Sequence, residues 1–345
     1  MAITRLNITE FLRKSPDGLI IDVRSPSEYK HAHMPNALSL PLFSDEERKV
    51  VGTNYKQQSR EDAIKIGLDF FGPKMRSMVE QVEMWMQERN LDIKQTPLFV
   101  HCWRGGMRSA GVAWLLDLYG FKVFTLHGGY KAFRTYINEL LNANYKLKVL
   151  GGRTGAGKTM FLKSAKENKL QAIDLEGLAN HKGSSFGKTN GVQPTQEAFE
   201  NALGIALSEI DTSKEIWVED ESARIGDVQI PNKFWANMRA AMVAYVDIPF
   251  EERLNYLIKD YKIVLNEDLT ASTLRIAKRL GGLETKNVLQ YLAEDNRKEA
   301  FRILLRYYDK WYDIGISKRE QSPIQKFTFE SHDKFDWKIV ANGKN

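Results

Sequence analysis

Short apolar runs alternate with amphipathic stretches along the first 140 residues of the chain. Residues 19–23, 97–101 and 122–126 are apolar runs of strand length. Residues 79–88 and 109–119 instead carry apolar side chains at the three- and four-residue spacing of an amphipathic helix. Strands that alternate with helices in this way indicate a parallel sheet covered by helices.

The same alternation starts again at residue 146, where an apolar strand (146–150) leads through a glycine-rich loop into a predicted helix (160–168). The break near residues 142–144 predicts two α/β domains, 1–141 and 145–345, the second with a helical C-terminal extension from about residue 260 to 313. The remaining predictions for the second domain are strands at 172–175, 215–220 and 242–247 and late edge strands at 327–330 and 337–340.

The length, charge and hydropathy of the chain limit the classes of protein to which it can belong. The chain has 345 residues, enough for two separate cores. Its net charge of +6 is spread evenly over both halves, so a polyanionic partner must be bound by local basic clusters. No apolar run approaches the roughly 20 residues of a membrane helix, and residues 1–10 lack the apolar core of a signal peptide. We therefore expect a cytoplasmic protein that does not enter a membrane.

The single cysteine, Cys102, follows the predicted strand 97–101 and opens a loop that ends at Arg108 and Ser109. One cysteine excludes an internal disulfide and a cysteine-rich metal cluster. Successive backbone N–H groups at a helix N-terminus lower the pKa of a thiol and bind an anion above its sulfur. The predicted anion cradle consists of Arg104, Gly105, Gly106 and Arg108.

Three roles fit this loop: transfer of sulfur or selenium as Cys-S-S⁻ or Cys-S-Se⁻, hydrolysis of a phosphate ester, or anion binding by an inactive remnant. The spacing Cys102-x5-Arg108-Ser109 matches the pattern of cysteine phosphatases. Typical sulfurtransferase loops are one residue shorter, so this loop predicts a wider cradle, suited to a phosphorus-bearing donor. The sequence identifies no general acid for a phosphatase, which favours transfer.

Residues 152–159 form a complete Gly-x4-Gly-Lys-Thr P-loop between a predicted strand and a predicted helix. Such a loop holds a di- or triphosphate on its backbone N–H groups and its lysine, and Thr159 is a candidate ligand of Mg²⁺. The predicted phosphate-binding residues are Gly152, Arg153, Thr154, Gly155, Ala156, Gly157, Lys158 and Thr159.

Polar residues that follow two strands of the second domain are candidates to support the P-loop. Glu219 and Asp220 end the strand 215–220 and Glu221 follows it, and these carboxylates can hold Mg²⁺ through water or orient a nucleophile. Asp174, His181 and Ser184 belong to a polar, glycine-rich segment, 174–187, that we expect at the mouth of the P-loop. The alternatives are a solvated strand end and an ordinary surface loop.

Two basic helical faces lie in the predicted extension. Arg275, Lys278 and Arg279 share one face, and Arg302 and Arg306 share another on a later helix. These faces either close over phosphates as a lid or contact an RNA backbone, and solvated surface is the simpler alternative. We favour RNA contact for the second face and weigh both roles equally for the first.

The motifs resemble two known families. Segments 22–29, 33–37, 101–109 and 126–130 resemble the successive signatures of a rhodanese domain over about residues 1–140, with 45–76 as an insertion that has no motif. A rhodanese domain followed by a P-loop domain resembles the bacterial tRNA 2-selenouridine synthase family. The loop at Cys102, the P-loop and the segment 174–187 all look like signatures of that family, and the resemblance covers nearly the whole chain.

The resemblance implies that selenium replaces sulfur on the wobble 2-thiouridine of tRNA, with selenophosphate as donor and a geranylated intermediate made from geranyl diphosphate. It implies tRNA and small phosphate donors as partners. We expect no tightly bound cofactor other than a candidate Mg²⁺ ion, and the sequence does not fix the oligomeric state. The residues agree with this chemistry, because alkylation converts a thiocarbonyl sulfur into a thiol that departs readily, and the diphosphate of the prenyl donor suits a P-loop.

Two other function classes fit the sequence. A rhodanese-type sulfurtransferase fused to an ATP-dependent small-molecule kinase would turn over ATP, and would transfer sulfur from thiosulfate without tRNA. A non-catalytic tRNA-binding adaptor would keep its function when serine replaces Cys102.

Overall fold

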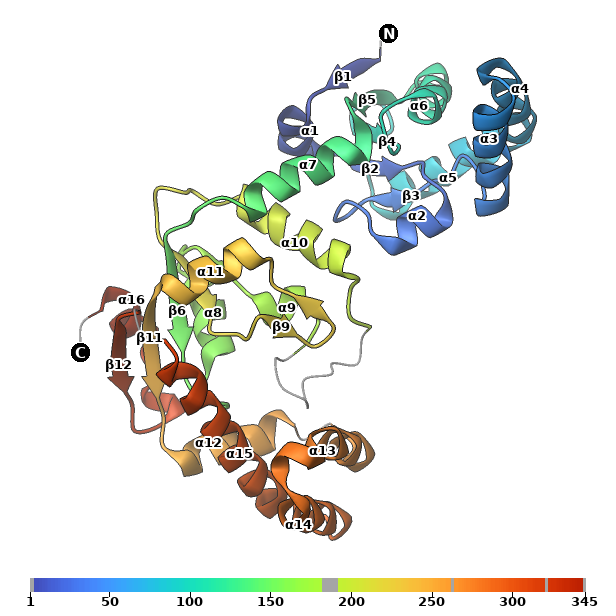
Figure 1. Cartoon of the computed structure of the whole chain (residues 1–345). Coiled ribbons are helices and arrows are strands. Elements are labelled where there is room, and N and C mark those ends of the chain that lie inside the picture. Colours follow the sequence, from blue (N-terminus) through green and yellow to red (C-terminus); the bar gives the residue numbers. More distant parts are fainter. Residues whose placement is uncertain (1–2, 182–191, 262–263, 320–321, 344–345) are drawn as a thin grey trace. The chain divides into compact units, whose positions relative to one another are not determined.

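The computed structural model describes residues 3–181, 192–261, 264–319 and 322–343. The chain forms two compact units, Met1–Leu140 and Leu141–Asn345 (Figure 1). Each unit is built on a five-stranded sheet whose paired strands all run parallel. The predicted α/β class is therefore confirmed.

The sheet of the first unit has the strand order β1-β5-β4-β2-β3. Its central strand β4 is buried on both faces, with Leu98, Phe99 and Val100 fully enclosed, as expected for a parallel sheet between helices. The strands are β1 (Thr4–Leu6), β2 (Leu19–Asp22), β3 (Leu38–Ser39), β4 (Pro97–His101) and β5 (Lys122–Leu126). The helices are α1 (Ile8–Lys14), α2 (Pro26–His31), α3 (Asp45–Gln57), α4 (Arg60–Phe71), α5 (Met75–Glu88), α6 (Met107–Tyr119) and α7 (Gly129–Leu141).

The segment without a motif, residues 45–76, contains the helix pair α3 and α4 and reaches the first residues of α5. Ser44 begins α3 with a capping box, because its hydroxyl accepts the Glu47 N–H at 3.2 Å while the Glu47 carboxylate accepts the Ser44 N–H at 2.8 Å. Ser59 begins α4 by accepting the Asp62 N–H at 3.0 Å. Both helix starts are thus encoded locally, although the sequence shows nothing of where the pair packs.

The sheet of the second unit has the order β12-β11-β6-β8-β7, and β9 and β10 form a separate antiparallel hairpin. The strands are β6 (Leu147–Gly151), β7 (Ala172–Ile173), β8 (Ile216–Glu219), β9 (Arg224–Ile225), β10 (Val228–Gln229), β11 (Met242–Asp247) and β12 (Ile324–Thr328). The helices around this sheet are α8 (Lys158–Glu167), α9 (Leu175–Leu178), α10 (Gln196–Ser208), α11 (Asn232–Ala240), α12 (Phe250–Asp260) and α16 (Trp337–Asn342).

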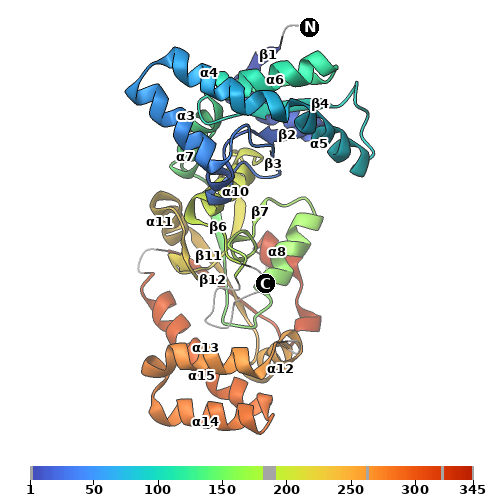
Figure 2. The same ribbon diagram turned by 90° about the vertical axis from the view of Figure 1, so that its right-hand side faces the viewer.

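The helical extension consists of α13 (Asn266–Leu280), α14 (Gly282–Ala293) and α15 (Arg297–Ser317), which pack against one another (Figure 2). Leu269, Val288 and Leu304 belong to their shared core. In the described part of the chain, no helix combines the length and apolar character needed to cross a bilayer.

The prediction of an edge strand at 337–340 is wrong. These residues open α16, because the Asp336 carboxylate accepts the Lys338 N–H at 2.8 Å and Val340 is fully buried in the core. The edge strand is β12, which begins three residues before the predicted 327–330. A four-residue apolar run fits a strand and a buried helical turn equally well, so packing decided between them.

Candidate functional site

Cys102 follows the carboxyl end of β4, in a loop held against the first turn of α7. The backbone carbonyl of Cys102 accepts the Tyr130 N–H at 2.8 Å, and that of Trp103 accepts the Lys131 N–H at 2.9 Å. Gly105 and Gly129 have φ of +64° and +58°, and a Cβ at Gly129 would overlap the Cys102 carbonyl oxygen. Glycine is therefore required where the cysteine loop packs against the start of α7.

The Cys102 thiol is buried at the N-terminus of α6, and its Sγ lies 3.2 Å from the Ser109 hydroxyl. Burial raises the pKa of the thiol, but hydrogen bonds from the hydroxyl and backbone N–H of Ser109, the Arg108 charge and the Gly106 backbone lower it further, so the pKa lies below its ordinary value. The loop therefore favours the reactive thiolate.

The two arginines of the predicted cradle differ in environment. Arg108 donates a 2.7 Å hydrogen bond to Glu28, which fixes the direction of its guanidinium. Burial raises the pKa of Glu28, whereas the Arg108 partner lowers it to a net value below the ordinary one. Arg104 is exposed beside the loop. Arg108 is thus held in place, and Arg104 is accessible to an anion.

A buried cluster formed by Asp22 and Arg24, which the sequence analysis missed, packs against the residue that closes the cysteine loop. Arg24 is 2% exposed, and its guanidinium donates to Asp22 at 2.6 Å and to the Ala32 carbonyl at 2.7 Å. It also lies 3.7 Å from the ring centroid of Tyr130, the residue that closes the cysteine loop. The motif around Asp22 and Arg24 was visible in the sequence, but its contact with Tyr130 was not.

Cys102 opens into a pocket of about 860 Å³, which we call the cysteine pocket. Helix α3 supplies one wall with the basic side chains Arg48, Lys49 and Lys56, opposite Arg104 and Arg108 on the cysteine loop. The sequence analysis missed these three residues because the insertion has no motif. Five basic side chains around one thiol favour an anionic substrate.

We expect alkylation of Cys102 by iodoacetamide to reach half its maximal rate at a lower pH than alkylation of an ordinary thiol. The folded loop favours the thiolate, so ionisation of Cys102 stabilises the folded chain at higher pH. This contribution is lost as the pH falls through the lowered pKa. Ser109→Ala should move the midpoint upward, because it removes a hydrogen bond to sulfur. The chain has one cysteine, so the label reports on this site alone. Ser77→Ala, at an exposed serine of α5, is the control, and an unchanged midpoint in Ser109→Ala would contradict the assignment.

The P-loop connects β6 to α8, as its motif predicts. Gly155 and Gly157 have φ of +79° and +85°, so the loop curls and the free N–H groups of the first turn of α8 point toward one pocket. The pocket measures about 320 Å³, and Gly155, Gly157, Lys158 and Thr159 are among its lining residues. The Lys158 ammonium donates to the Gly152 carbonyl at 2.9 Å. This geometry suits a bound di- or triphosphate.

Arg253 and Tyr312 hold the P-loop, and the sequence analysis missed both roles. Arg253 on α12 is 2% exposed and donates to the Thr154 carbonyl at 3.0 Å and to Asp309 on α15 at 2.8 and 2.7 Å. The Tyr312 hydroxyl accepts the Gly152 N–H at 2.7 Å and donates to Asp220 at 3.0 Å. These contacts join α12 and α15 to the loop.

The remaining predicted P-loop residues have structural partners. Arg153 pairs with Asp313 at 2.9 Å, which raises the pKa of its guanidinium. Ala156 is buried, with its N–H donating to the Arg153 carbonyl at 3.0 Å. The Arg153 side chain is thus directed to α15, so Lys158 and the backbone of the loop supply the anion-binding capacity.

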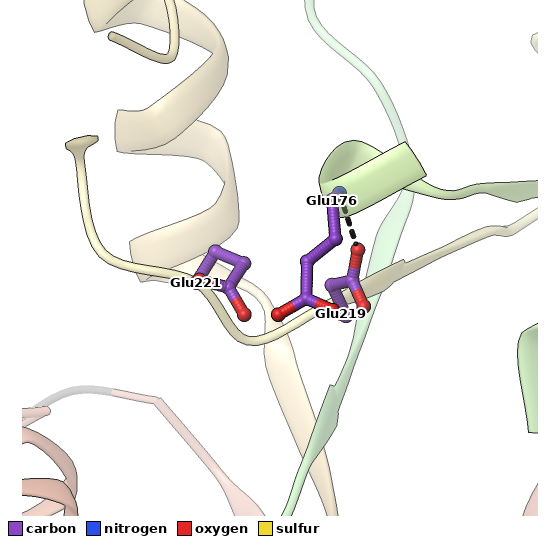
Figure 3. A group of neighbouring side chains, drawn as sticks. All are labelled: Glu176, Glu219 and Glu221. Atoms are coloured by element: carbon purple, nitrogen blue, oxygen red, sulfur yellow. Dashed lines mark hydrogen bonds between the residues drawn. The ribbon is translucent and has the colours of Figure 1, made fainter. Parts of the chain in front are cut away.

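Three carboxylates meet at the edge of the P-loop pocket, and Figure 3 shows Glu176, Glu219 and Glu221 close together. One oxygen from each of Glu176, Glu219 and Glu221 lies within 4.8 Å of the others. Glu219 accepts the Glu176 N–H at 2.8 Å with one oxygen, and its other oxygen is buried with no hydrogen-bond partner among the described residues. Glu176 and Glu221 also line the P-loop pocket.

Burial, followed by the Glu176 charge, raises the pKa of Glu219 to about 8. Burial and the charges of Glu176 and Glu219 raise the pKa of Glu221 as well. A divalent cation would allow such a group to remain ionised, because oxygen ligands and negative charge are what Mg²⁺ requires. The residues present therefore fit a Mg²⁺ ion.

The other predicted support residues have contacts of their own. Asp220 lines the P-loop pocket, and its carboxylate accepts hydrogen bonds from Tyr312 and Arg319, which join the end of β8 to the C-terminal part of the chain. Asp174 caps α9 by accepting the Gly177 N–H at 2.7 Å. His181 is buried, and its backbone N–H donates to the Glu176 carbonyl at 3.0 Å. Ser184 lies outside the described residues.

The basic residues of the extension lie on α13 and α15. Arg275, Lys278, Arg279 and Arg306 are exposed, and the described residues that line the P-loop pocket include none of them. Arg302 is half-buried and pairs with Glu251 and with Glu299, the latter at 3.2 Å. Its charge is therefore largely compensated, which distinguishes it from Arg306.

Family models match both units of the chain. A rhodanese-like domain model matches residues 8–136, and a model described as the tRNA 2-selenouridine synthase AAA domain matches residues 145–337. The two matches cover the cysteine loop and the P-loop respectively.

Curated relatives match over most of their length. A tRNA 2-selenouridine synthase of Shewanella denitrificans is 35% identical over 352 residues, covering 92% of this chain and 92% of that protein. A protein of the same name from a Sulfurovum species is 36% identical over 335 residues, covering 87% and 89%. A third, from Hydrogenovibrio crunogenus, is 36% identical over 334 residues, covering 87% and 90%.

Proposed function

Because this chain belongs to the tRNA 2-selenouridine synthase family, we propose that it replaces sulfur by selenium at the wobble 2-thiouridine of tRNA through an S-geranylated intermediate. Its substrates are geranyl diphosphate and selenophosphate. The observation that carries the proposal is the combination of one thiol with a lowered pKa in a cationic pocket and a complete P-loop in the second unit. Each feature serves one of the two chemical steps.

The first step is prenylation at the P-loop. The 2-thiouridine sulfur attacks the carbon that carries the diphosphate, so a C–S bond forms, a C–O bond breaks and diphosphate leaves, while N3 of the base releases its proton to solvent. Lys158 and the N–H groups of the P-loop hold the leaving group and its growing negative charge. Glu176, Glu219 and Glu221 would hold Mg²⁺, which supplies further neutralisation of that charge when bound.

The second step takes place at Cys102. Its thiolate attacks the phosphorus of selenophosphate, so an S–P bond forms, the P–Se bond breaks and hydrogen selenide leaves. The selenide attacks C2 of the base and geranyl thiol departs, and water then cleaves the S–P bond to give phosphate. No oxidant is needed, whereas a Cys-S-Se⁻ species made from selenophosphate would require one. The wide Cys102-x5-Arg108 loop and its basic wall support an attack at phosphorus.

The proposal is tested by mass analysis of tRNA nucleosides after incubation with the protein. Geranyl diphosphate alone should give the S-geranylated nucleoside, and the addition of selenophosphate should convert it to 2-selenouridine. ATP turnover and thiosulfate sulfurtransfer without tRNA, with no change in the nucleosides, would favour the sulfurtransferase–kinase alternative.

The basic helices give a separate prediction about tRNA binding. We expect Arg306→Ala to flatten the salt dependence of tRNA binding by roughly one unit, because each phosphate contact releases about one counterion. Arg302→Ala should flatten it less, since Glu251 and Glu299 already compensate that charge. The measurement is a titration with tRNA at several salt concentrations, extended to Ala variants of Arg275, Lys278 and Arg279.

The same set of variants separates RNA contact from a lid. A lid residue would raise the apparent KM for geranyl diphosphate and leave the salt dependence unchanged. Arg76→Ala in the first unit, whose side chain is 90% exposed, is the control for unspecific charge loss. Unchanged tRNA affinity in all five extension variants would remove α13 and α15 from the RNA surface.

A further inference from the structure

The insertion helices enclose a second hollow in the first unit, which we call the insertion pocket. Its volume is about 390 Å³, within the roughly 300–1,000 Å³ of small-ligand sites. Helices α3, α4 and α6 supply most of its walls, and Arg108 is the one charged side chain among its described lining residues. The hollow therefore suits an apolar ligand.

Large apolar side chains stay exposed around this hollow. Tyr55, Leu68, Met107 and Trp114 are 53%, 56%, 50% and 51% exposed, and all four line it. Soluble proteins rarely gather so many exposed apolar groups at one place unless the place binds something. The floor is made by the buried ring of Phe71, so the hollow is a preformed surface on a packed core.

The insertion pocket is continuous with the cysteine pocket. Phe43, Val51, Tyr55, Met107 and Arg108 line both. Met107 and Arg108 begin α6, and both line the cysteine pocket together with Cys102. A ligand that fills both pockets therefore has an apolar part in contact with α4 and α6. Its polar, reacting part lies beside Cys102 and the basic residues of α3.

We propose that the insertion pocket binds the isoprenoid chain of the S-geranylated nucleotide and so holds its C–S bond beside Cys102. The inference rests on the proposed function, which supplies this nucleotide. An isoprenoid chain has no polar atoms to satisfy, and its double bonds suit contacts with Trp114, Tyr55 and Met107. The pocket would then distinguish the geranylated intermediate from unmodified 2-thiouridine before selenium is delivered.

The test compares the binding of three anticodon stem-loop RNAs to the full chain, carrying S-geranyl-2-thiouridine, S-methyl-2-thiouridine or 2-thiouridine. The wild type should bind the S-geranyl RNA at least about ten-fold more tightly than the S-methyl RNA, because burial of the chain removes apolar surface from water. Leu68→Asp should remove most of this preference. Leu118→Asp is the matched control, since Leu118 is 67% exposed on α6 but does not line the pocket.

Trp114→Ala is a second variant, used if the thermal unfolding midpoint of Leu68→Asp falls well below that of Leu118→Asp. It should likewise remove most of the preference for the S-geranyl RNA. A wild type that forms S-geranyl tRNA but shows no preference for it, or variants that keep the full preference, would overturn the pocket assignment alone. A wild type that forms no S-geranyl tRNA would instead contradict the proposed function. Loss of self-association in Leu68→Asp, with the preference intact, would assign the hollow to contact between copies of the chain.

Discussion

Replacing Cys102 with serine is expected to make S-geranylated tRNA accumulate while 2-selenouridine falls by at least roughly 100-fold, the scale of losing a catalytic nucleophile. A serine hydroxyl is a much weaker acid than a thiol and stays protonated near neutral pH, so no anion is present to attack the selenium donor. Prenylation needs the diphosphate site of the second unit, which the substitution leaves intact. The measurement is mass analysis of tRNA nucleosides with both small substrates present.

Cys102→Ala tests, in the same assay, whether the effect of Cys102→Ser comes from loss of the thiolate or from a change in the shape of the loop. It should behave like Cys102→Ser, because both lack a thiolate and both keep the glycines that close the loop on Cys102. Equal loss of the geranylated and the selenylated nucleoside would contradict the division of labour between the two sites. Full activity of Cys102→Ser would favour the non-catalytic adaptor.

Replacing Lys158 with alanine is expected to lower geranylation by at least roughly 100-fold, the scale of removing one group that stabilises a developing anion. The Lys158 ammonium reaches the Gly152 carbonyl across the curl of the P-loop, so it lies where the diphosphate charge would be held. Affinity for tRNA should stay within a few-fold of the wild type, since one charge among many is lost. Geranylation is measured with geranyl diphosphate and 2-thiouridine-containing tRNA.

Lys163→Ala is the matched control for Lys158→Ala, because Lys163 is exposed on the same helix, α8, and does not line the P-loop pocket. It should leave geranylation unchanged. If Lys158→Ala kept geranylation and lost only ATP binding, the P-loop would be a nucleotide site, and the sulfurtransferase–kinase alternative would gain.

Both anion-binding loops could be predicted because their structure is encoded within a few consecutive residues. A strand, a turn that requires glycine and a helix N-terminus follow one another around Cys102 and around Lys158. Local hydrogen bonds and backbone geometry are enough to form such loops, so their motifs can be recognised in the sequence alone. The caps of α3 and α4 at Ser44 and Ser59 are equally local.

The surroundings of these loops were decided by tertiary packing. Asp220 lines the P-loop pocket, but its carboxylate is engaged by Arg319 and Tyr312, whereas the buried strand residue Glu219 meets Glu176 and Glu221. A strand end presents alternate side chains to opposite faces, so its sequence shows neither which carboxylate faces the phosphate nor what the others contact.

The sequence by itself determined the two α/β units, the thiol in its anion cradle and the P-loop, because each depends on neighbours in the chain. The tertiary structure alone decided that Arg253 and Asp309 support the P-loop, that α3 places basic side chains before Cys102, and that α4 and α6 leave an apolar hollow beside it. These features join residues far apart in the chain, and burial and shape complementarity between whole elements, which no short motif records, bring them together.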